Sequence, residues 1–91
     1  MLFRSSAGMA AKDPLLARLG TYLRGVRQSR GWSQEEMGFR ARLHRTYVGA
    51  VERGEYNLTL LTLRRITDTL GITIVEAVRS AATHARRPKA V

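Results

Sequence analysis

The sequence predicts a single all-α domain of five short helices. Apolar residues recur at the spacing of three and four that places them on one side of a helix, and no stretch keeps the strict alternation of a strand. Polar capping residues precede the apolar series, and a glycine follows most of them. A chain of 91 residues is long enough for one hydrophobic core and too short for two.

The first two helices are predicted from the residues that begin and end them. Asp13 can cap a helix whose first residue is Pro14, and leucines follow at helical spacing until Gly31. Ser33 and Glu36 then have the spacing of a capping box, which predicts a second, short helix.

The same signals predict three more helices. His44 begins a third helix that ends before Gly54, and Thr59 caps a fourth that closes at Gly71. Thr73 begins another capping box and therefore a fifth helix. The predicted helices start at about residues 14, 33, 44, 59 and 73, and the first three end at about residues 30, 40 and 53.

The two ends of the chain differ from the helical part. Residues 1–12 show no apolar periodicity and predict a flexible arm, whereas residues 81–91 predict a basic tail. The domain itself is expected at residues 13–80. No stretch has the length of a signal peptide core or of a membrane span, so we expect a cytoplasmic protein without a membrane partner.

Charge and composition indicate the class of partner. The 16 basic and 7 acidic residues give a net charge of +9, which attracts nucleic acid. There is no cysteine, and the two histidines lie far apart, so we expect no disulfide, no metal and no cofactor. No nucleophile is paired with a base, which argues against an enzyme, and no small-molecule ligand is expected.

The second and third helices have the arrangement of a helix-turn-helix, because three residues join them and further helices flank them. The twenty residues from Gln34 to Arg53 carry Gly38 at the fifth position, where the two helices of such a motif cross closely. Apolar residues fill the packing positions of the motif at Met37, Leu43, Val48 and Val51.

At these residues the sequence resembles the Cro/CI-type, or xenobiotic-response-element-type, helix-turn-helix regulators. The resemblance is carried by "LRGVRQSRGWSQEEMG" and "LHRTYVGAVERGEYNLTLLTLRRITDTLGI" and covers roughly residues 15 to 78. Within the family, "HRTY" followed by "ERG" is most similar to the small controller proteins of restriction-modification systems. The resemblance implies a phage-repressor-like five-helix domain that binds duplex DNA and regulates transcription.

Three residues depart from the family pattern. Arg42 occupies the turn position that usually carries a glycine, which predicts a strained or altered turn. Gly38 stands where alanine is usual and predicts a second helix weaker by up to about 1 kcal/mol. Leu58 stands where proline is common and predicts a less rigid loop.

The third helix is the candidate DNA-reading helix. A helical wheel places an apolar set on one side, and the other side carries small residues that favour close approach by a major groove over an ordinary solvated face. An arginine there can pair with guanine, and a methyl group can meet thymine. The predicted base-reading residues are Arg45, Thr46, Gly49 and Ala50.

A second set of residues is expected to hold the DNA backbone. Gln34 begins the second helix, whose free N–H groups favour a phosphate, and the resemblance implies a backbone contact for this side chain. The alternative is an ordinary surface glutamine. His44 is expected to cap the third helix or to contact a phosphate, and Arg53 and Asn57 are placed for backbone contacts at its end.

Glu52 lies beside the predicted core, where a buried carboxylate needs a partner. The family resemblance implies an ion pair with Arg27 that links the first and third helices. Both residues are therefore expected to be structural.

One domain of this size makes few base contacts, so we expect a homodimer on a palindromic operator. The seam is expected at the end of the fourth helix and in the fifth helix, among apolar residues of which some must belong to the core instead: Leu70, Ile72, Ile74, Val75 and Val78. The alternative is an antitoxin-type helix-turn-helix protein that binds a toxin and its own operator.

Overall fold

The computed structural model describes residues 13–83, and within that range it contains five helices and no strand. The helices are α2 (Pro14–Ser29), α3 (Gln34–Ala41), α4 (Arg45–Glu52), α5 (Leu60–Leu70) and α6 (Ile74–Thr83). The predicted five-helix, all-α fold is confirmed. None of the helices in this range is long and apolar enough to cross a membrane.

The predicted ends of the chain fall mostly outside the described residues. The arm at residues 1–12 and the tail from residue 84 onward cannot be compared with the prediction for that reason. The tail was predicted to begin at residue 81, whereas α6 continues to Thr83. The helix extends because Ala81 is buried in the core and its carbonyl oxygen accepts a hydrogen bond of 2.9 Å from Nε of Arg18.

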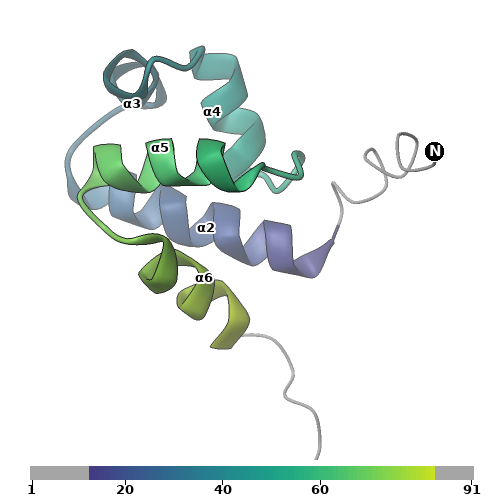
Figure 1. The fold of residues 1–91 in the computed structure, drawn as a ribbon. Coiled ribbons are helices and arrows are strands. Elements are labelled where there is room, and N and C mark those ends of the chain that lie inside the picture. Colours follow the sequence, from purple (N-terminus) through teal and green to yellow (C-terminus); the bar gives the residue numbers. More distant parts are fainter. Residues whose placement is uncertain (1–12, 84–91) are drawn as a thin grey trace, which may run out of the picture.

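The helices are arranged so that the helix-turn-helix and the last helix lie on opposite sides of the molecule. Figure 1 shows α2 and α5 across the middle, α3 and α4 together above them, and α6 below. The helix α6 packs mainly against α2, and α3 packs mainly against α4. A surface formed by α4 and a surface formed by α6 are therefore separate.

The helix starts are set by side-chain caps, as the sequence predicts. Thr73 and Glu76 form a complete capping box, since each side chain accepts a hydrogen bond from the backbone N–H of the other. Ser33 accepts from the N–H of Glu36 at 2.9 Å, but the Glu36 carboxylate pairs with Arg40 at 2.7 Å. The predicted Ser33–Glu36 capping box is therefore only half formed: Ser33 caps α3, and Glu36 instead forms an exposed ion pair with Arg40.

Residues far apart in the sequence cap the end of α5. The Arg30 side chain, at the end of α2, donates two hydrogen bonds of 3.0 and 2.6 Å to the carbonyl oxygen of Leu70. A cation at the C-terminal end of a helix also interacts favourably with the helix dipole. This contact fixes α5 on α2 and was not predicted.

The turn between α3 and α4 keeps the left-handed backbone that usually calls for glycine. Arg42 has φ 61° and ψ 45°, and its N–H donates to the carbonyl oxygens of Gly38 and Phe39. The strain predicted for this turn is therefore the left-handed backbone of Arg42, a conformation that is costly for a residue with a Cβ atom.

Gly38 has a steric role that propensity alone did not reveal. A Cβ atom on Gly38 would collide with the backbone carbonyl oxygen of Leu43, which is part of the turn into α4. The prediction that glycine simply weakens α3 was therefore incomplete, because no larger residue fits here unless the turn moves.

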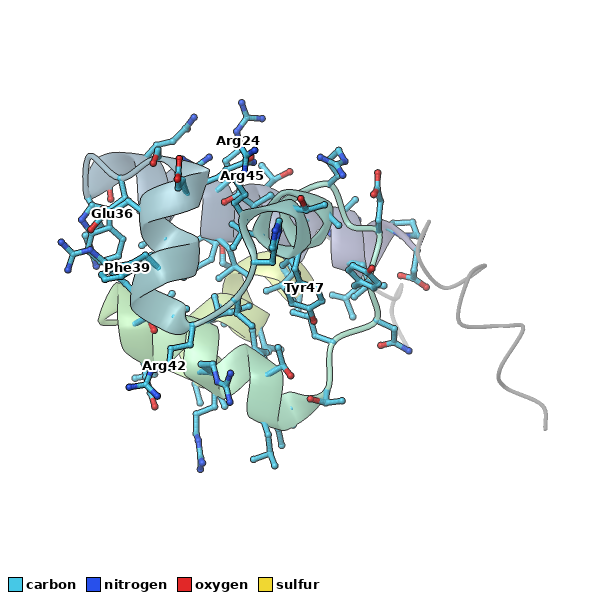
Figure 2. The ribbon with its side chains drawn as sticks, turned by 90° about the horizontal axis from the view of Figure 1, so that it is seen from above. Arg24, Glu36, Phe39, Arg42, Arg45 and Tyr47 are labelled. Carbon is cyan, nitrogen blue, oxygen red and sulfur yellow. The ribbon has the colours of Figure 1, made fainter. Side chains whose placement is uncertain are left out.

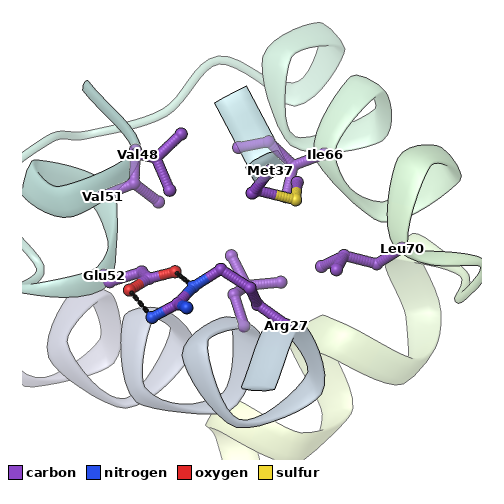
Figure 3. Close-up of a pocket in the computed structure, with 8 residues that line it drawn as sticks. Arg27, Met37, Val48, Val51, Glu52, Ile66 and Leu70 are labelled. Atoms are coloured by element: carbon purple, nitrogen blue, oxygen red, sulfur yellow. Dashed lines mark hydrogen bonds and ion pairs between the residues drawn. The ribbon is translucent and has the colours of Figure 1, made fainter. Parts of the chain in front are cut away.

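The core contains side chains from all five helices. It is formed by Leu19, Leu23, Met37, Ala41, Val48, Val51, Leu63, Ile66, Leu70, Ala77 and Ala81. A cavity of about 10 Å³ remains between these side chains, which is at the lower limit for a single water molecule. Figure 3 shows that one charged pair, Arg27 with Glu52, borders this apolar region.

Candidate nucleic-acid interface

The expected Arg27–Glu52 ion pair joins α2 to α4 and is buried, with 7% and 8% of the two residues exposed. Nε of Arg27 lies 2.6 Å from one carboxylate oxygen of Glu52 and Nη2 lies 3.0 Å from the other (Figure 3). Nη1 donates to the carbonyl oxygen of Trp32 at 2.7 Å. The two hydrogen bonds to Glu52 and the third to Trp32 offset the cost of burying the charged guanidinium.

The same carboxylate also positions Gln34. Nε2 of Gln34 donates to Oε1 of Glu52 at 3.0 Å, so a continuous network runs from α2 through α4 to the first residue of α3. An amide nitrogen carries two N–H groups, and one bond to Glu52 leaves the second for another acceptor. The core ion pair thus orients a side chain that was predicted to contact a phosphate.

The first turn of α4 is exposed to solvent, whereas the middle of the helix is buried. Arg45 and Thr46 are exposed, whereas Gly49 and Ala50 are buried. A Cβ atom at Gly49 would lie 3.2 Å from Nη1 of Arg53 and 3.3 Å from Oε1 of Gln34, so these two side chains cover the glycine.

The helical wheel was therefore wrong in placing Gly49 and Ala50 on an open face. It treats one side of a helix as solvent, but α4 packs against both α2 and α3. Within α4 the exposed residues are Arg45 and Thr46 of the first turn, and Arg53 is exposed just after the helix ends. Base reading by this helix is left to Arg45 and Thr46 as candidates.

His44 serves as the cap of α4. Its Nδ1 accepts a hydrogen bond of 3.0 Å from the N–H of Thr46, so the ring is held against the first turn of the helix. The cap fixes the backbone that carries both exposed candidates.

A second arginine extends the basic surface beyond α4. Figure 2 shows Arg24 of α2 and Arg45 of α4 at the same edge of the molecule, and both residues are exposed. The sequence interpretation missed Arg24. It lies on the helix that packs against α4, and its position relative to Arg45 depends on how the two helices pack, so no local signal in the sequence identifies it.

The end of α4 and the loop after it carry the remaining candidates. Arg53 forms two hydrogen bonds of 2.8 and 3.1 Å to the carboxylate of Glu55, and these bonds raise the pKa of the guanidinium. Asn57 is exposed in the same loop. The ring centroids of Tyr47, in α4, and Tyr56, in the loop, lie 4.8 Å apart, and this contact ties the loop to α4. Burial, and to a smaller extent the neighbouring Tyr56, raises the pKa of the Tyr47 hydroxyl.

The candidate dimer seam contains both core and surface residues. Leu70 is 2% exposed and belongs to the core, so its assignment to the seam was wrong. Ile72 and Ile74 are partly buried against the core. Val75 and Val78 are 60% and 42% exposed, and α6 lies on the side of the molecule opposite α3 and α4 (Figure 1).

Comparison with known proteins agrees with this architecture. The helix-turn-helix family matches residues 23–76. A hypothetical transcription factor from Neisseria meningitidis serogroup B is 38% identical over 66 residues, which are 72% of this chain and 62% of the Neisseria protein. The match thus spans less than two thirds of that relative.

Two further similar proteins are control proteins. Control protein C.BamHI from Bacillus amyloliquefaciens is 39% identical over 54 residues, or 58% of this chain and 67% of that protein. The crystal structure of the restriction-modification controller protein C.AhdI from Aeromonas hydrophila has a TM-score of 0.63 and 36% identity. That alignment covers 72% of this chain and 94% of C.AhdI.

Proposed function

Since the chain belongs to the helix-turn-helix family and is related to restriction-modification control proteins, we propose that it binds duplex DNA by sequence and regulates transcription. The resemblance stated from the sequence is confirmed. The family is one of DNA-binding regulators and not of enzymes. The observation that carries the proposal is the open, capped first turn of α4, which exposes Arg45 and Thr46 on the helix whose Gly49 is covered by Gln34.

The geometry suggests how the domain reads DNA. The first turn of α4 enters the major groove, where the Arg45 guanidinium forms two hydrogen bonds with a guanine and the Thr46 methyl group meets a thymine methyl. Gln34 uses its second N–H on a phosphate, together with the free N–H groups at the start of α3. Arg53 and Asn57 contact the backbone beyond the other end of α4.

We extend the proposal to a cytoplasmic homodimer on a palindromic operator, as a controller protein of a restriction-modification system. The exposed valines of α6 support the dimer, because they lie on the side opposite α4 and leave the DNA-facing surface free. Two copies related by a two-fold axis would present two reading helices to half-sites about one helical turn apart.

Selection from a random duplex pool tests the function directly. Protein immobilised through its C-terminus is incubated with the pool, and bound duplexes are amplified and sequenced through several rounds. We expect a palindromic consensus with two half-sites about 10 base pairs apart. Recovery of sequences without any consensus would contradict sequence-specific binding.

Two substitutions then separate base reading from backbone holding. Arg45→Ala should lose about 1 to 3 kcal/mol per half-site on the selected duplex and much less on random DNA. Gln34→Ala should weaken both duplexes to similar extents, and it should leave the salt dependence nearly unchanged because glutamine is uncharged.

Fluorescence anisotropy titrations of both variants at several salt concentrations measure these differences. Unfolding curves for Gln34→Ala are needed as well, because that variant also loses the bond to Glu52. If Arg45→Ala weakens both duplexes equally and flattens the salt dependence, Arg45 is a backbone contact and Thr46 is left as the reading residue.

A further inference from the structure

One of the arginines proposed to bind phosphate already forms hydrogen bonds with a carboxylate of the protein itself. Arg53 ends α4, and Glu55 follows it after a single glycine. Two hydrogen bonds, from Nε to Oε2 at 2.8 Å and from Nη2 to Oε1 at 3.1 Å, join the two side chains. A guanidinium binds a phosphate with the same paired donors, so Glu55 uses an edge of Arg53 that a phosphate could use.

The pair lies on the face through which DNA binding is proposed. Nη1 of Arg53 reaches back along α4 to within 3.2 Å of the position a Cβ atom on Gly49 would take. Gln34, from the start of α3, approaches the same position at 3.3 Å. Arg53 and Gln34 therefore both lie over Gly49 of α4, and the Glu55 carboxylate is hydrogen-bonded to Arg53 although the chain as a whole is strongly basic.

The pairing opposes DNA binding because it uses the charge of Arg53. While Arg53 keeps its two hydrogen bonds to Glu55, the pair has no net charge and attracts a phosphate less than a single guanidinium would. Arg53 must give up these bonds before the same donors can bind a phosphate. The pairing therefore reduces the number of phosphates that the protein neutralises, and that number sets the affinity for DNA of any sequence.

We propose that Glu55 limits the DNA affinity of this protein by occupying the phosphate-binding edge of Arg53. The inference rests on the proposed function. Because its effect is electrostatic and does not involve a base, it lowers binding to random and selected duplexes alike. The ratio of the two affinities, which measures specificity, is set by the first turn of α4 and should not change.

The test is the Glu55→Gln variant, which keeps the size of the side chain and removes its charge. Affinities for a random and a selected duplex are measured at several salt concentrations by fluorescence anisotropy. Both duplexes should bind about two- to fivefold more tightly per subunit, the range expected for an exposed ion pair. The slope of log affinity against log salt should become steeper by about 0.9 per subunit.

Two controls separate the mechanism from a general charge effect. Asp68→Asn changes the net charge by the same amount at an exposed position on α5, and it should change affinity and slope less. In an Arg53→Ala background, Glu55→Gln should lose its effect, because the guanidinium through which it acts is gone. Circular dichroism verifies that each variant is folded.

The inference is overturned if Glu55→Gln leaves affinity and slope unchanged, if Asp68→Asn gives the same gain, or if the gain survives Arg53→Ala. These failures leave the proposed function intact, since wild-type protein would still bind its selected duplex. A wild-type protein that binds no duplex at all contradicts the proposed function itself.

Discussion

Replacing Glu52 with alanine should remove a large part of the stability of this domain. The carboxylate accepts three hydrogen bonds, two from Arg27 and one from Gln34, and it is 8% exposed. Among the described residues, Glu52→Ala leaves the buried Arg27 guanidinium with the Trp32 carbonyl as its one remaining hydrogen-bond partner. Loss of one partner of a buried ion pair costs about 3 to 5 kcal/mol.

This loss is large compared with the total stability of a small domain, which is about 5 to 15 kcal/mol. With about 4 °C or more per kcal/mol for a domain of this size, the melting temperature should fall by more than about 12 °C. Thermal and urea unfolding followed by circular dichroism measure the change.

The matched control is Glu36→Ala, which breaks the exposed pair with Arg40 and should cost about 1 kcal/mol or less. Equal and small losses for Glu52→Ala and Glu36→Ala would refute the argument, because they would mean that the Arg27–Glu52 pair does not hold α2 against α4.

Two further predictions concern the backbone near the turn. Gly38→Ala should lower the free energy of unfolding although alanine has the better helix propensity, because its Cβ atom would collide with the Leu43 carbonyl oxygen. The control is Gly25→Ala, which has open space around its Cβ atom and should raise the free energy of unfolding by about 0.5 to 1 kcal/mol. Urea unfolding compares the two, and a Gly38→Ala variant more stable than the wild type would contradict the close contact with Leu43. Arg42→Gly should raise the free energy of unfolding by up to about 1 kcal/mol because glycine adopts a positive φ without strain. Arg42→Ala removes the charged side chain but keeps the Cβ atom that is strained at positive φ, so it should show no such gain in the same assay.

The helices could be predicted closely because the signals that begin and end them are local. A cap such as Ser33 or Thr73 bonds to a backbone N–H three residues away, so its partner is fixed by the sequence itself. The same holds for the helix-turn-helix, whose two helices are joined by a short turn. Left-handed backbone at Arg42 follows from that geometry as well, since the turn needs a positive φ whichever residue occupies it.

The shape of the candidate DNA-binding face was less predictable because distant side chains decide it. A wheel drawn for α4 alone could not show that Gln34 and Arg53 fold over Gly49. Nor could spacing show that Gln34 shares the carboxylate of Glu52, since the two residues belong to different helices. The expected ion pair came from family resemblance, whereas its connection to a proposed DNA contact required the structure.

The proposed dimer seam was the hardest part to predict, because helical periodicity marks every buried apolar residue alike, whether the core or a partner subunit covers it. The structure removes Leu70 from the candidates and leaves Val75 and Val78, which lie three residues apart on one side of α6. In a two-fold interface each valine is used twice, and burying one valine side chain contributes about 1.5 kcal/mol or more. The double variant Val75→Asp/Val78→Asp should therefore be a folded monomer, because both residues are exposed and neither belongs to the core. Leu60→Asp/Leu61→Asp, which changes two exposed apolar residues of α5, should remain dimeric. Analytical ultracentrifugation with circular dichroism distinguishes the outcomes: a folded dimer of the valine variant would exclude α6 as the seam, and a monomer produced by the leucine variant alone would transfer the seam to α5.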